Sequence, residues 1–158
     1  MSISLQKFVL NLKSLQKDFP VIVKKIIEEK SQEFIKANID SWDKGKMPDG
    51  SEITNKFTGS TDYSLGWTVT RKEKGLPVGH YYLQFTGELS KSLFLEVKIN
   101  TTKISVNLKP QSFVIDKAAD LNKMFGDVIG IPIEYLTIFV TWFETELVKQ
   151  LKLKLFAA

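Results

Sequence analysis

Two short runs of strictly alternating residues, separated by a polar break, constrain the fold of this 158-residue chain more than any other feature. Apolar side chains occupy every second position from Leu93 to Ile99 and again from Ile104 to Leu108. Successive side chains of a strand point to opposite faces, so each run would bury one face and leave the other wet. The break Asn100-Thr101-Thr102 is short enough for a tight connection. The pattern predicts an antiparallel hairpin over about residues 92–109.

Helical spacing opens the chain. Apolar residues recur at intervals of three and four from Leu5 to Phe19, which predicts an amphipathic helix over about residues 4–18. We expect Pro20 to end this helix and to begin a second one, because the missing N–H of proline is not needed at the first helical position. The same spacing then continues towards Trp42. The sequence therefore predicts two N-terminal helices.

Two further helices are expected after the hairpin. Asp116 is placed to cap a short helix over about residues 117–124, which stops before Gly126. Pro132 is expected at the first position of a long final helix over about residues 132–155. Its apolar stripe consists of Leu136, Phe139, Val140, Phe143, Leu147, Leu151 and Leu155. The fold class is therefore α+β, with helices at both ends of a small antiparallel sheet.

The chain shows no internal repeat and no shift in composition, so residues 1–158 are expected to form a single domain with a long arm at about residues 43–80. Apolar residues are sparse in the arm, and Pro48-Asp49-Gly50 is a turn signal. We expect the arm to be loose in the free protein, cut by proteases between Lys44 and Lys74, and ordered on assembly. The alternative is an extended arm lying on the core, with Trp67 and Val69 facing inward.

Composition narrows the functional classes. No window is apolar enough for a membrane span, so a cytosolic location is expected, and the absence of cysteine excludes disulfides and thiolate chemistry. The net charge of +4 comes almost entirely from lysine, and Arg71 is the only arginine. Scattered lysines favour a solvated surface over a dedicated nucleic-acid face. A basic nucleic-acid-binding module is kept as the alternative function.

No arrangement of residues predicts catalysis. His80 is the only histidine and has no partner at a triad or metal spacing, and the acidic segment Asp40 to Asp49 lacks the ligand spacing of a calcium loop. Asp116 and Asp120 would lie one helical turn apart, as a pair of metal ligands could. A role of Asp116 as N-cap and of Asp120 as an exposed neighbour of lysines explains them better. We therefore expect no catalytic, cofactor-binding or metal-binding residues. A small hydrolase would need a pocket around Asp116 or Asp40.

The segment before the hairpin, "LQFTGELSKS", is expected to fix where the first strand begins. The hydroxyl of Thr86 can cap a short helical turn, Gly87 permits a close backbone approach, and Leu89 and Leu93 anchor the turn on the sheet. A capped turn before a core strand explains the segment, and an added interface role remains open beside it.

Three motifs in order resemble a family of small structural proteins of tailed bacteriophages, the minor proteins of the head-tail junction and of tail completion, most clearly those of phages of Bacteroidetes-like hosts. An asparagine, an aromatic, a glycine and an "xDG" turn follow the second helix, a "TGxLxxS" element feeds a strand, and "(F/Y)G" precedes an apolar-glycine-apolar segment. The matching residues are Asn38, Trp42, Gly45, Asp49 and Gly50; Thr86, Gly87, Leu89 and Ser92; and Phe125, Gly126, Ile129, Gly130 and Ile131. A "YA" pair and an arginine that many relatives carry before the last segment are absent.

The resemblance covers residues 20 to 155 and implies a non-enzymatic virion protein, present in the host cytoplasm during assembly. Its partners would be copies of itself in a ring and neighbouring connector or tail proteins. Head connector, tail terminator and tail completion protein remain open as roles. The resemblance gives one candidate structural or interface motif, made of Trp42, Gly45, Gly50, Thr86, Gly87, Leu89, Phe125 and Gly126.

Overall fold

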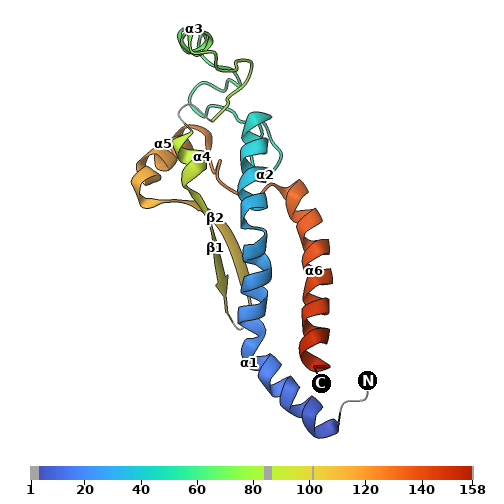
Figure 1. The fold of residues 1–158 in the computed structure, drawn as a ribbon. Coiled ribbons are helices and arrows are strands. Elements are labelled where there is room, and N and C mark those ends of the chain that lie inside the picture. Colours follow the sequence, from blue (N-terminus) through green and yellow to red (C-terminus); the bar gives the residue numbers. More distant parts are fainter. Residues whose placement is uncertain (1–3, 84–86, 101, 158) are drawn as a thin grey trace.

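The computed structural model describes residues 4–83, 87–100 and 102–157, which form an elongated molecule (Figure 1). Helices α1 (Leu5–Glu29) and α2 (Ser31–Asp43) are stacked end to end, with the hairpin on one side and α6 (Ile133–Leu155) on the other. Helices α3 (Leu65–Glu73), α4 (Glu88–Ser92) and α5 (Ile115–Phe125) gather towards one end. The expected mixture of helices and a small antiparallel sheet is confirmed.

The hairpin has the predicted strands. β1 (Leu93–Ile99) pairs antiparallel with β2 (Ile104–Pro110), and the register sets Leu95 opposite Leu108 and Val97 opposite Val106. These apolar pairs share one face of the sheet and pack against the long helices. Charged side chains occupy the other face, where both Lys98 and Lys109 pair with Glu96. Within the described residues the sheet has two strands, so each strand keeps an outer edge for which no strand partner is present.

The expected break at Pro20 is wrong. Pro20 lies inside α1, which continues to Glu29, and Figure 1 shows that the helix bends within its N-terminal part. A proline inside a helix removes one backbone hydrogen bond and kinks the helix. The helix can continue past the proline when residues before and after it are packed against the rest of the protein. Leu15 before it and Val23 after it are both buried. The chain leaves helical geometry instead at Lys30, where neither glycine nor proline marks the boundary.

One core joins the long helices to the hairpin. Val23 and Ile27 of α1, Phe34 of α2, Leu108 of β2 and Phe139 of α6 are all buried together. The ring of Phe34 lies 4.6 Å from that of Phe139, measured between centroids. Burying aliphatic and aromatic side chains of this size contributes about 1.5–3 kcal/mol each to stability. This core therefore fixes the hairpin and α6 on opposite sides of the α1–α2 rod.

The arm contains a helix that sequence reasoning missed. Residues 65–73 form α3, and Trp67 and Val69 on it are half exposed, so the expected extended arm with both side chains facing inward is wrong. The first part of the arm is fixed to the body, because Ile53 is buried in the core and the N–H of Lys56 donates to the Met124 carbonyl at 2.8 Å. Preferential proteolysis of the arm stays a prediction.

The two C-terminal helices are close to their expected positions. A 3-10 turn (Ser112–Val114) leads directly into α5, so Asp116 lies in the first turn of the helix and is not the cap that we expected. Gly126 ends α5 with φ of 102°, as expected. Pro132 immediately precedes α6, whose one buried residue among those described is Phe139. Leu136 and Val140 of the expected apolar stripe are exposed.

The outer face of the hairpin gives a pH-dependent prediction. Hydrogen bonds from Lys109 and Lys98 lower the pKa of Glu96 below its ordinary value of 4.5. A carboxyl whose pKa is lower in the folded state stabilises the fold above its unfolded pKa, and this contribution disappears as pH falls through the folded pKa. We expect Glu96→Gln to lower the melting temperature at pH 7, and the two melting temperatures to converge in acid below pH 4.5.

Thermal unfolding followed by circular dichroism over this pH range measures the difference. Glu144→Gln, which removes an exposed carboxylate from α6, is the matched control and should show no comparable pH-dependent gap. A gap for Glu96→Gln that persisted at low pH would contradict the role of its charge.

Candidate functional site

The three motifs of the sequence meet in one core at the end of the molecule that carries α4 and α5. Trp42, Leu89 and Phe125, one from each motif, are all buried there. The indole Nε1–H of Trp42 donates to the carbonyl of Val128 at 2.7 Å, and the side-chain amide of Asn38 donates to the same carbonyl at 3.3 Å. The first motif is thus bonded directly to the backbone within the third. These side chains are buried and shape the body from within, so they do not form an exposed interface with another subunit.

The glycines of the motifs serve the backbone. Gly45, Gly50, Gly87 and Gly126 all have positive φ, a region that other residues adopt at a cost. Gly87 is the N-cap residue of α4, and its φ of 72° favours glycine. Among the described residues a Cβ atom there would meet nothing closer than 3.9 Å, so the expected close backbone approach stays a prediction. Thr86, its expected capping partner, lies outside the described residues.

Gly45 has a second constraint. A Cβ atom at this position would lie 2.6 Å from the ring of His80, which covers it. The Nε2–H of His80 donates to the carbonyl of Asp43 at 2.9 Å, and its ring stacks on Tyr82 with centroids 3.9 Å apart. The single histidine of the chain therefore connects the two ends of the arm, residues 43 and 80, through this hydrogen bond. This is a structural role, and His80 has no described neighbours that would form a triad with it.

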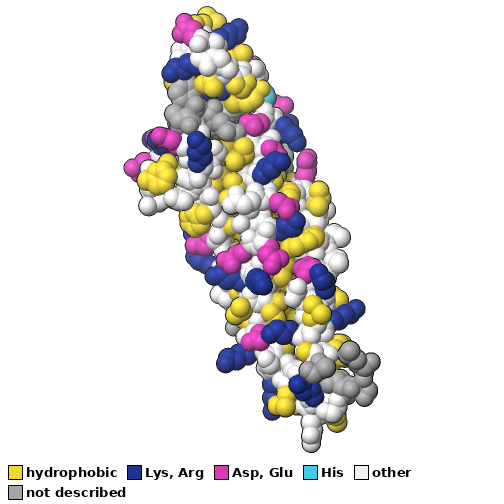
Figure 2. Space-filling view, in the orientation of Figure 1, with side chains coloured by type: hydrophobic (Ala, Val, Ile, Leu, Met, Phe, Trp, Pro, Cys, Tyr) yellow, Lys and Arg dark blue, Asp and Glu magenta, His cyan; other side chains and the backbone are white. Residues whose placement is uncertain are grey.

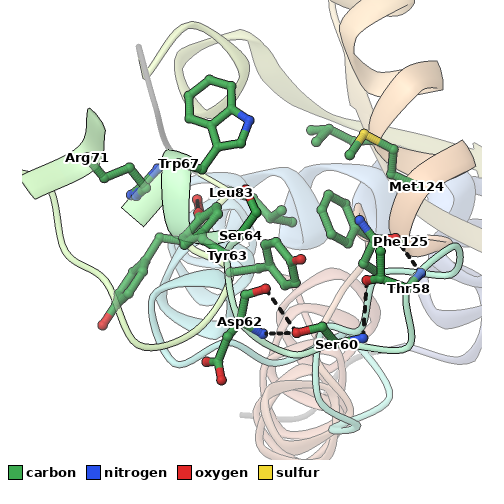
Figure 3. A pocket seen from close by; sticks show the side chains of 14 residues that line it. Thr58, Ser60, Asp62, Tyr63, Ser64, Trp67, Arg71, Leu83, Met124 and Phe125 are labelled. Carbon is green, nitrogen blue, oxygen red and sulfur yellow. Dashed lines mark hydrogen bonds between the residues drawn. The ribbon is translucent and has the colours of Figure 1, made fainter. Parts of the chain in front are cut away.

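A pocket of about 430 Å³ lies between the arm and α5 (Figure 3). Its walls are mainly aromatic and aliphatic, with Trp67 and Arg71 on one side of the view and Met124 and Phe125 on the other. Polar groups at its mouth are engaged in the turns of the arm itself. The hydroxyl of Ser60 accepts from the N–H of Asp62 at 3.0 Å, and the amide oxygen of Asn55 accepts from the N–H of Phe57 at 2.9 Å.

Arg71 is the buried charge of this pocket. Only 2% of the residue is exposed, and its guanidinium lies over the ring of Tyr63 at 4.6 Å, a cation–π contact. Its Nε–H donates to the carbonyl of Pro77 at 2.9 Å. Burial raises the pKa of the Tyr63 phenol against the opposing field of Arg71, and the neutral hydroxyl donates to the carbonyl of Tyr82 at 2.7 Å. Nη2 of Arg71 is buried without a hydrogen-bond partner among the described residues.

The local sequence explains how Arg71 is held. Gly75, with φ of 65°, ends α3 in a Schellman motif, in which the N–H of Leu76 donates to the Arg71 carbonyl and the N–H of Gly75 to the Lys72 carbonyl. The turn brings Pro77 back to the arginine side chain. Sequence reasoning noted Arg71 only as the single arginine of the chain and gave it no role. A glycine and a proline following a short helical segment were the signal that could have located this turn.

A second candidate site is an apolar surface on the N-terminal part of α1. Leu5, Val9, Leu12 and Phe19, which we call the overhang stripe, continue at helical spacing the row that contains Val23. Val23 is fully buried, whereas Phe19 is 37%, Leu12 46% and Leu5 79% exposed. Figure 1 shows that this part of α1 extends beyond the end of the hairpin. The described residues therefore leave the stripe partly exposed, and Leu5 most of all.

Helix α6 has exposed apolar side chains along its length. Ile133, Val140 and Val148 are exposed, and between them the hydroxyls of Thr137, Thr141 and Thr145 donate to backbone carbonyls four residues earlier, at 3.1, 3.4 and 3.0 Å. Because these hydroxyls are occupied, the threonines present mainly methyl groups to the surroundings. None of the helices in the described part of the chain combines the length and hydrophobicity that crossing a membrane requires.

Charge is distributed without a dominant patch on the face that Figure 2 shows. Lysine and acidic side chains alternate along the length of the molecule, with apolar groups between them. Asp116 and Asp120, which lie one helical turn apart, are exposed on α5, and Asp40, the other position around which a hydrolase pocket was considered, is exposed on α2. Among residues 4–83, 87–100 and 102–157, no group of three histidines or carboxylates is placed to hold a metal ion.

Comparison with known proteins gives no relative: the chain matches no family model, no curated protein and no solved structure. The likeness of its three motifs to junction proteins of tailed phages therefore stays a prediction from the sequence. The pocket and the overhang stripe are the features of the structure that bear on function.

The glycine that His80 covers yields a direct test. We expect Gly50→Ala to cost about 1 kcal/mol for its positive φ alone, because nothing lies within 4 Å of the added methyl. Gly45→Ala pays the same backbone cost and also displaces His80, which adds about 1–3 kcal/mol. Urea unfolding of both variants measures the free energies. Equal losses would show that His80 does not constrain this position.

Proposed function

We propose that this protein is a non-enzymatic structural component of a tailed bacteriophage particle, acting in head-tail joining or tail completion by packing subunits into a ring. The observation that carries the proposal is the overhang stripe, an apolar helical surface that the described part of the chain leaves partly exposed. Monomeric proteins rarely leave contiguous apolar surface of this kind exposed, and such surfaces mark sites of protein association.

The total surface supports the same proposal. The accessible area of the chain is 10412 Å² for a mass of 18.0 kDa, whereas a compact monomer of that mass exposes about 8,000 Å². The difference, about 2,400 Å², exceeds the 1,200–2,000 Å², roughly, that a specific protein interface buries in total. An elongated subunit with surplus surface is suited to contacts with neighbours on two sides, as a closed ring requires.

We assign the overhang stripe to a neighbouring copy of this chain. A ring uses two different surfaces of each subunit, and the stripe together with the unpaired outer edge of one strand offers such a pair. Neighbouring connector or tail proteins would contact the ends of the ring. The function rests on shape and apolar contact, and the proposal includes no cofactor and no catalytic residue.

The nucleic-acid alternative has less support. Arg71, the only arginine, is buried beneath aromatic rings and so does not contribute to a basic surface for a nucleic-acid backbone. On the face shown in Figure 2, acidic side chains interrupt the lysines. A nucleic-acid-binding module would bind DNA most tightly at low salt and lose affinity steeply as salt rises. The absence of DNA binding at low salt would therefore exclude this alternative function.

Quantitative peptide mass spectrometry on purified particles of the phage whose genome encodes the chain tests the proposed function. We expect the protein in the particle at low stoichiometry relative to the major capsid protein, on the order of 6 to 12 copies, as one closed ring gives. Its absence from washed particles would overturn the virion role. A copy number approaching that of the capsid protein would overturn the placement at the junction.

A further inference from the structure

The pocket beside Arg71 combines features that a purely structural cavity does not need. Its lining is mostly apolar, yet it contains a guanidinium that is almost completely buried. The ion pairs found among the described residues are all made by lysines, so Arg71 has no acidic partner there. A buried charge without a counter-charge is costly, and contacts with tyrosine rings offset that cost only in part.

The remaining polar groups of the pocket do not supply a counter-charge or a hydrogen-bond acceptor for Arg71. Ser60 and Asn55 are engaged in turns of the arm, and Figure 3 shows the carboxylate of Asp62 pointing away from Arg71. Nη2 of Arg71 is the group left without a hydrogen-bond acceptor among the residues described. The group that would complete the pocket is therefore an acceptor, and a negatively charged one.

We propose that this pocket binds a carboxylate carried on an aromatic or aliphatic group, with the carboxylate on Arg71 and the apolar part between Trp67 and Phe125. A planar guanidinium matches a carboxylate in charge and in hydrogen-bond geometry. Arg71 is the one basic residue of the lining, and the single acidic residue, Asp62, points its carboxylate away from it, so the pocket suits a monoanion better than a phosphate dianion. A volume of about 430 Å³ lies within the range of small-ligand sites and holds a group the size of one aromatic side chain.

The ligand has two possible sources with this same chemistry, a free organic acid and the carboxylate of a polypeptide. The inference goes beyond the proposed function and does not depend on it, because the pocket lies at the end of the molecule opposite the overhang stripe. Loss of self-association and loss of ligand binding would therefore be separate results.

Titrations of the full chain, followed by two-dimensional amide NMR, test the proposal. The probes are 3-phenylpropionate and its neutral amide, and the dipeptide N-acetyl-alanyl-phenylalanine with its C-terminal amide. We expect the acids to shift resonances of α3 and α5 with a Kd below about 1 mM. Each amide should bind at least about tenfold more weakly, because it lacks the charge-assisted bonds. A peptide acid at least about tenfold tighter than the free acid would identify a polypeptide ligand, and equal affinities a small organic acid.

Variants separate the charge from the walls of the pocket. Arg71→Gln should remove the preference for acid over amide, whereas Lys72→Gln, which removes an exposed charge from the same helix, should leave it unchanged. Trp67→Ala should weaken acid and amide alike, and it keeps the test available if Arg71→Gln does not fold. Equal binding of acid and amide by the wild-type chain, or no shift with either up to about 10 mM, would overturn the proposal.

Discussion

The packing of Phe34 against the hairpin and α6 is the interaction on which the rest of the structure depends. Phe34 is fully buried, and its ring contacts those of Phe139 and Tyr135 of α6, with centroids 4.6 and 5.2 Å away. The hydroxyl of Tyr135 also donates to Glu33, whose pKa is lowered by a hydrogen bond from Lys30 and, to a smaller extent, by this one from Tyr135. The hairpin and α6 lie on opposite sides of the rod formed by α1 and α2. Phe34 belongs to the core that holds both of them on this rod, so losing its contacts would loosen both.

The same arrangement explains why apolar surface remains. The hairpin is seven residues long in each strand, whereas α1 extends for 25 residues, so the sheet covers only part of the helix. Beyond the hairpin, α1 keeps its apolar spacing and contacts α6 at its end, where Phe8 meets Phe156 and Lys154 pairs with Asp18. The overhang stripe lies on this part of α1, beyond the reach of the hairpin, and is partly exposed to solvent. An assembly partner that continues this layer is the simplest way to bury it.

Sequence patterns predicted the elements whose signals are local. Period-two alternation located the hairpin and its buried face, and Gly126 located the end of α5, because each rests on backbone geometry of a few residues. The continuation of α1 through Pro20 depends on tertiary packing. The contact between Arg71 and Tyr63 depends on α3, a helix that the sequence pattern did not predict. The motif residues were chosen as a possible interface, yet burial of Trp42 and Phe125 is decided by the whole fold.

Sedimentation velocity over an about hundredfold range of concentration tests the central claim, that the overhang stripe is a contact between copies. We expect the wild-type chain to associate as its concentration rises. The double variant Val9→Lys with Leu12→Lys should stay monomeric with unchanged helical content, and Ser14→Lys, on another face of α1, should associate like the wild type. A wild-type chain that is monomeric throughout, or a double variant that associates equally well, would contradict the account.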